Sequence, residues 1–79
     1  MSAQRIEDLE FSQRIIRIKG VMLRTGLSRS YIYHLSAVGS FPKSIPLVPG
    51  GTSVGWVSAE ITEWIESRIN ARDEDASND

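Results

Sequence analysis

The sequence predicts a mainly α-helical domain with a small β-hairpin wing, the arrangement of a winged helix-turn-helix. The stretch Thr25–Leu35 carries the signals of a turn and the second helix of a helix pair. A segment with three prolines follows, in which Pro49-Gly50-Gly51 separates two short apolar runs and predicts a hairpin. An apolar stripe at helical spacing then begins after Ser58.

The bulk composition indicates one small domain. A chain of 79 residues can form only a small core, and a core of this size contributes only a few kcal/mol of stability. The chain has no cysteine, which excludes disulfides and thiolate metal sites and fits a reducing compartment. Neither a membrane span nor a signal peptide is recognisable, so we expect a cytoplasmic protein without a membrane partner.

The formal charge of −1 hides a basic domain between acidic flanks. From Arg14 to Arg72 there are eight basic and three acidic residues, whereas the flanks hold one arginine and seven acids. The stretch from Arg14 to Ser58 contains six basic residues and no acid. A field of one sign attracts and steers polyanions. Uneven charge in a small domain can also serve solubility alone.

The chain is predicted to divide into three parts. Residues 1–13 are polar and acidic and are expected to form a flexible arm. The domain covers residues 14–72 and begins with the β-branched Arg14–Ile18, an extended lead into a first helix over about Lys19–Thr25. Residues 73–79 are acidic, lack large apolar side chains and are expected to form a disordered tail.

The turn between the first two helices has recognisable local chemistry. Gly26 can take positive φ just after the first helix, and Ser28 has the place and the hydroxyl of an N-cap. Leu27 and Ile32 then have the spacing of a hydrophobic staple, which fixes the angle at which the chain enters the second helix. That helix is predicted over about Ser28–Val38.

The hairpin and the last helix complete the fold. Ile45 and Leu47 mark one strand and Val54 and Trp56 the other, and Pro46 restricts its strand to a sheet edge. The last helix is expected to begin at a Ser58 N-cap and to carry a stripe of Ile61, Trp64, Ile65 and Ile69. Trp56 and Trp64 are predicted to be the two anchors of the core.

The residues predict neither an enzyme nor a cofactor or metal site. His34 is the single histidine, and the chain offers no cysteine to pair with it. Glu63 and Glu66 are three residues apart, yet further oxygen or imidazole ligands are missing. The segment Pro49–Ser53 has no lysine and no helix directly after it, so it does not match a phosphate-binding loop.

The second helix is the predicted contact surface for double-stranded DNA. Residues near the start of such a helix reach base edges in the major groove, which here are Arg29, Ser30, Tyr33 and His34. Arg29 can bond a guanine at two points or hold a phosphate, and a solvated surface arginine is the alternative. Two other candidates, Ser28 and Arg24, are expected to contact phosphates. The last two, Lys43 and Thr52, lie on the wing, which can touch the backbone or the minor groove beside the helix.

Five blocks together resemble a known family. R-I-I-R-I and R-T-G-L-S-R-S-Y-I-Y are followed by G-S-F-P-K, V-G-W and E-I-x-x-W-I, all between Arg14 and Arg68. Their order and spacing resemble the AlpA family of prophage regulators, small winged helix-turn-helix proteins similar in fold to MerR-type DNA-binding domains and phage excisionases. The resemblance implies DNA binding, transcriptional control and often excision of an integrated element.

The resemblance also implies roles for single residues. Ser28, Arg29, Ser30 and Tyr33 fall in the family's recognition helix, and Phe41-Pro42-Lys43 opens its wing. The family's structural aromatics correspond to Trp56 and Trp64, whereas His34 stands where the family commonly has arginine and Gly20 and Leu23 depart from its first helix.

The resulting hypothesis is a sequence-specific transcriptional regulator of a prophage or other integrated element. One alternative is an excisionase-like architectural factor that directs an integrase, and another is a protein-interaction module with weak DNA affinity. A homodimer and a cooperative multimer on DNA both fit, because one module covers only a short half-site. An integrase or RNA polymerase is the expected protein partner.

Overall fold

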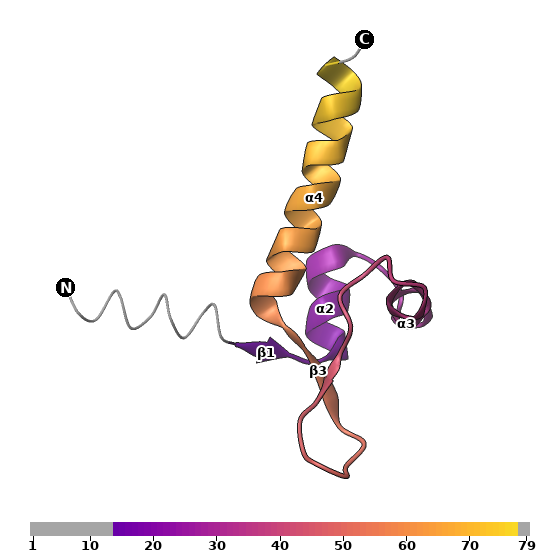
Figure 1. The fold of residues 1–79 in the computed structure, drawn as a ribbon, viewed down its shortest axis with the longest axis vertical. Helices are drawn as coiled ribbons and strands as arrows, with labels where there is room; N and C mark the ends of the chain where they lie inside the picture. The colour runs from indigo at the N-terminus through magenta and orange to yellow at the C-terminus, as the bar shows by residue number, and fades with distance from the viewer. Residues whose placement is uncertain (1–13, 78–79) are drawn as a thin grey trace, which may run out of the picture.

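The structure is a computed structural model that describes residues 14–77, so the arm predicted over residues 1–13 lies outside the described residues. Its elements, in order, are β1 (Ile15–Ile16), α2 (Ile18–Thr25), α3 (Arg29–Ala37), β2 (Ile45–Pro46), β3 (Val54–Val57) and α4 (Ser58–Ser77). The helix α4 and the loop between β2 and β3 project from the body in opposite directions (Figure 1). This mainly helical arrangement with a small sheet is compatible with a winged helix-turn-helix. Within the described part, none of the helices combines the length and apolarity needed to cross a membrane.

The sheet has three strands in the order β1-β3-β2, and both pairings are antiparallel. Ile16 lies opposite Trp56 in one pairing, and Ile45 lies opposite Gly55 in the other. The predicted hairpin is therefore present, and Pro46 lies on an edge strand as expected. The sequence indicated that the segment before α2 is extended, but it did not indicate that this segment pairs with β3.

Gly55 lets the strands approach closely in the middle of the sheet. It is buried in β3 between β1 and β2. A Cβ atom at this position would collide with the Ile15 side chain and would lie 3.2 Å from the Ile16 carbonyl oxygen. It would also lie 3.4 Å from the Leu47 side chain. The absence of a side chain at position 55 is therefore a condition for the observed packing of β1 on β3.

The core lies where α2, α3 and α4 meet the sheet. Its buried hydrophobic residues are Val21, Ile32, Phe41, Trp56 and Ile61. Trp56 has no exposed surface, which confirms its predicted role as an anchor, and Trp64 is partly buried and packs against the cluster. The predicted apolar stripe is wrong at its far end, because Ile69 is 44% exposed where α4 leaves the body.

The turn between α2 and α3 matches the local chemistry predicted for it. Gly26 has a φ of 76°, and its N–H donates to the Met22 carbonyl at 2.8 Å. The Ser28 hydroxyl accepts a hydrogen bond from the Tyr31 N–H at 3.2 Å, which confirms Ser28 as the N-cap of α3. Behind this turn, Leu27 packs against the cluster that contains the fully buried Ile32. The entry angle of α3 is thus set by contacts within a few residues.

The end of α3 is equally well defined. Gly39 has a φ of 83°, and the Ser40 N–H donates to the Leu35 carbonyl at 2.8 Å. The Gly39 N–H donates to the Ser36 carbonyl at 3.3 Å. These two bonds and the left-handed glycine form a Schellman motif, which stops the helix and turns the chain toward the sheet.

The start and the end of α4 both differ from expectation. Ser58 is the first residue of the helix, and its hydroxyl accepts a hydrogen bond from Arg24 at 3.1 Å, where a capping role was expected. The helix continues through Ser77, whereas a disordered tail was expected from Asp73 onward. Acidic composition alone therefore did not indicate how far the helix runs.

Candidate nucleic-acid interface

One face of α3 points away from the core. Ser30, His34 and Ala37 follow at spacings of four and three residues, so they share a side of the helix. All three are exposed, whereas Ile32 on the opposite side is completely buried. We call Ser30, His34 and Ala37 the outer face of α3. It places the predicted contact residues Ser30 and His34 together, and it adds Ala37.

The first turn of α3 presents donors at one end of this outer face. Arg29 is the first residue of the helix and is exposed. The amides of Arg29 and Ser30 lie where an α-helix leaves its N–H groups without intrahelical partners, and such amides favour an anion. The Ser28 hydroxyl accepts from the backbone as a cap, which leaves its own proton available to donate.

The two tyrosines of α3 flank the outer face on different sides. The ring of Tyr33 lies 5.7 Å from that of Trp56, centroid to centroid, so this tyrosine reaches toward β3 and remains 43% exposed. Tyr31 is 51% exposed, and its ring stacks against that of His34 with the centroids 6.1 Å apart. The Tyr33 contact joins α3 to β3.

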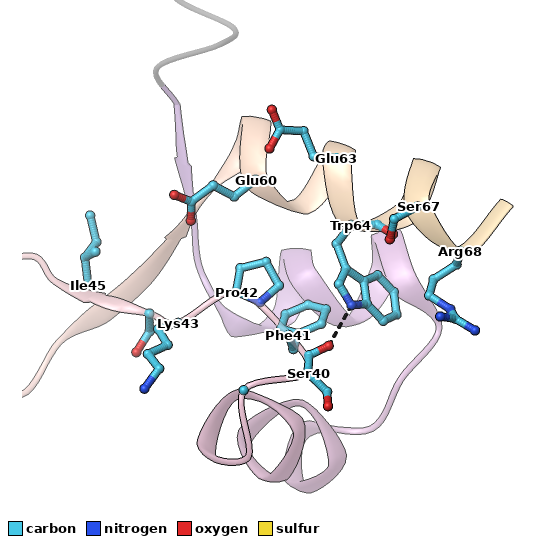
Figure 2. A pocket seen from close by; sticks show the side chains of 12 residues that line it. Ser40, Phe41, Pro42, Lys43, Ile45, Glu60, Glu63, Trp64, Ser67 and Arg68 are labelled. Carbon is cyan, nitrogen blue, oxygen red and sulfur yellow. Dashed lines mark hydrogen bonds between the residues drawn. The ribbon is translucent and has the colours of Figure 1, made fainter. Parts of the chain in front are cut away.

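A short linker from Ser40 to Pro42 connects α3 to the hairpin, and three side chains hold its backbone. The Pro42 carbonyl accepts from the Trp56 indole N–H at 3.1 Å and from the Ser36 hydroxyl at 3.0 Å. The Ser40 carbonyl accepts from the Trp64 indole N–H at 2.8 Å, as the dashed line in Figure 2 shows. Indoles from β3 and α4 therefore fix the linker, and with it the position of α3 relative to the hairpin.

The ring of Phe41 anchors the same linker in the core. Phe41 is 4% exposed, and its ring meets that of Trp64 edge to face, with centroids 4.8 Å apart. Edge-to-face pairs are a favoured aromatic geometry. Sequence reasoning placed the tryptophans in the core but did not predict that their N–H groups hold this linker. The signal available in the sequence was that a buried indole N–H normally needs an acceptor.

The hairpin carries the remaining predicted contacts. Lys43 lies just before β2, and Thr52 lies in the loop before β3; both side chains are exposed. Neither residue is on α3, so both lie outside the outer face of that helix.

Arg24 has structural partners that the sequence did not indicate. Its guanidinium donates to the Ser58 carbonyl at 3.2 Å, to the Ser58 hydroxyl at 3.1 Å and to the Thr62 hydroxyl at 2.6 Å. These bonds tie the last turn of α2 to the first turns of α4. The side chain predicted to hold a phosphate is therefore engaged within the domain.

An open groove with a volume of about 960 Å³ runs between the linker and α4. Figure 2 shows Lys43 on one side of it and Glu60, Glu63 and Arg68 along α4. No residue of the outer face of α3 lines this groove. Its walls carry both signs of charge, unlike the acid-free stretch that contains α3.

The geometry defines a class: a small domain in which two helices joined by a three-residue turn present one exposed helix face beside a β-hairpin. The family model described as prophage CP4-57 regulatory protein (AlpA) matches residues 14–69. The chain therefore belongs to the AlpA family, and the predicted resemblance is confirmed.

Two curated relatives support this membership. The chain is 41% identical over 61 residues to the DNA-binding transcriptional activator AlpA of Escherichia coli K12, which covers 70% of this chain and 84% of that protein. It is 43% identical over 60 residues to the uncharacterized protein ORF88 of Enterobacteria phage P4, which covers 76% of this chain and 66% of the phage protein. No solved structure matches the chain.

Proposed function

We propose that the protein is a sequence-specific DNA-binding transcriptional regulator of a prophage or other integrated element, built as a MerR-like, excisionase-like winged helix-turn-helix. The observation that carries the proposal is the outer face of α3, an exposed helix surface held rigidly from behind. Family membership and the relative that is named as a DNA-binding transcriptional activator support the same function.

In this proposal α3 enters the major groove. Ser30 and His34 face the base edges, and Arg29 reaches either a guanine or a phosphate from the first turn. Ser28 and the free amides of that turn donate to a phosphate, which sets the register of the helix on the duplex. Tyr33 borders the major groove on the side nearest the sheet.

The hairpin flanks the groove, and Lys43 and Thr52 contact the backbone there. Arg24 acts within the domain as a clamp between α2 and α4, because both terminal nitrogens of its guanidinium already donate to Ser58 and Thr62. This assignment replaces the phosphate contact predicted for Arg24. Arg17 and Lys19, two further exposed basic residues before and within α2, supply additional phosphate contacts.

A selection of bound duplexes from a random pool, followed by footprinting on the host element, tests the proposal. The expected result is an enriched motif and a footprint over a promoter. A footprint over an attachment site with direct repeats would instead support the excisionase alternative. Recovery of no motif, together with weak binding to every duplex, would refute the proposal and support a protein-interaction module.

A further inference from the structure

The loop of the hairpin is exposed but carries no charge. It links β2 to β3 through residues 47–53, and its sequence is L-V-P-G-G-T-S. Val48 is 56% exposed and Pro49 is also exposed, so an apolar pair forms the tip. Lysine and arginine are the usual means of holding a phosphate backbone. A charge-free tip on a wing beside a recognition helix therefore suits a different kind of contact.

The tip is fixed in shape. Gly50 has a φ of 76° and follows Pro49, which is the residue pattern of a type II turn. Two backbone hydrogen bonds close the loop, from Gly51 N–H to the Val48 carbonyl at 2.9 Å and from Leu47 N–H to the Ser53 carbonyl at 2.9 Å. A tip held in this way loses little conformational entropy when it binds, so even a small apolar contact can contribute affinity.

We propose that Val48 and Pro49 form an apolar wedge that enters the minor groove beside the α3 site and bends the duplex. The inference rests on the proposed DNA binding. Apolar side chains of architectural proteins press between or against base steps in the minor groove and bend the DNA toward the major groove. The wedge gives the wing a role in shaping the DNA in addition to the backbone contacts of Lys43 and Thr52.

Size and surroundings favour DNA as the occupant of this tip. The minor groove is about 6 Å wide, which suits one valine and one proline, whereas a stable protein interface needs about 800 Å² from each partner. No acidic residue lies between Arg14 and Ser58, so nothing on this part of the chain repels a phosphate backbone that approaches the tip. Lys43, just before β2, adds a positive charge at the base of the hairpin.

The wedge is tested with Val48→Ser in the full chain, with Val38→Ser as the matched control. Val38 is the same residue type with 59% exposure, and it is the C-cap residue of α3 and not part of the loop. Each protein is titrated against the duplex recovered by selection over a range of salt concentrations. The bend is measured by energy transfer between dyes at the two ends of a duplex of about 30 base pairs. Circular dichroism checks that each variant is folded.

We expect Val48→Ser to weaken binding about tenfold, the loss that follows from removing about two buried methyl groups, with an unchanged salt slope. The bend should decrease, and Val38→Ser should match the natural protein in both measurements. If Val48→Ser binds and bends the duplex as the natural protein does, the wedge is overturned and the proposal of DNA binding is unaffected. A loss confined to cooperative binding at adjacent sites would also overturn it, because the tip would then contact a second copy. Failure of the natural protein to bind any duplex would instead remove the proposed function.

Discussion

The linker between α3 and the hairpin offers a quantitative prediction. The Pro42 carbonyl accepts two hydrogen bonds, one from the Trp56 indole and one from the Ser36 hydroxyl. Trp56→Phe removes the first donor and keeps an aromatic ring in the core. Ser36→Ala removes the second. Because either donor alone leaves the carbonyl satisfied, the two substitutions should be more damaging together than the sum of their separate effects.

The size of this coupling follows from the contacts. Trp56→Phe loses one hydrogen bond and part of a fully buried side chain, for a cost of about 2 kcal/mol. Ser36→Ala loses one hydrogen bond, for a cost of about 1 kcal/mol. In the double variant the carbonyl has lost both donors, and an unsatisfied acceptor in a partly buried place adds about 1 kcal/mol. The double variant should therefore lose about 4 kcal/mol.

Urea unfolding of the natural protein, both single variants and the double variant gives the coupling energy directly. Ser67→Ala is the matched control, because the Ser67 hydroxyl donates to the Trp64 carbonyl and shares no acceptor with Trp56. Combined with Trp56→Phe, it should be additive. If Ser36→Ala and Trp56→Phe are also additive within about 0.5 kcal/mol, the shared carbonyl does not hold the linker and the reasoning is refuted.

Three further substitutions test other parts of the account. Gly55→Ala should destabilise the domain by about 1–3 kcal/mol in urea, because the new Cβ collides with Ile15; unchanged stability would contradict the close approach of β1 and β3. Arg24→Met should lower the free energy of unfolding by about 1–3 kcal/mol, because its bonds to α4 are lost. The salt slope of DNA binding should stay unchanged; a slope reduced by about one would show that Arg24 contacts a phosphate. Arg29→Ala should weaken specific binding by about 1–3 kcal/mol and relax preference at one base pair in a repeated selection; equal loss on every sequence would identify a phosphate clamp.

Local chemistry explains why much of the fold could be predicted. The turn before α3 depends on Gly26, Ser28 and Leu27, which act within a few residues of their own positions. The burial of Ile32 follows from the same helical spacing that exposes Ser30 and His34. Sequence patterns therefore sufficed for the helix pair and for the exposed positions of α3.

The rest depends on contacts between distant residues. β1 has only two residues, and its pairing with Trp56 and Val57 cannot be read from its own composition. The acceptors of Arg24 lie 34 and 38 residues further along the chain, so its position near the turn predicts a DNA contact instead. The acidic composition after Arg72 predicts disorder, whereas the helix runs through Ser77.

The central claim is that α3 reads a DNA sequence, and one ratio tests it most directly. The dissociation constant for the selected duplex is compared with that for a shuffled duplex of the same composition at about 0.15 M salt. The account predicts that the selected duplex binds at least about a hundredfold more tightly. It also predicts that Ser30→Ala combined with His34→Ala removes most of this preference while the affinity for the shuffled duplex changes little. Equal affinity of the natural protein for both duplexes would contradict the claim.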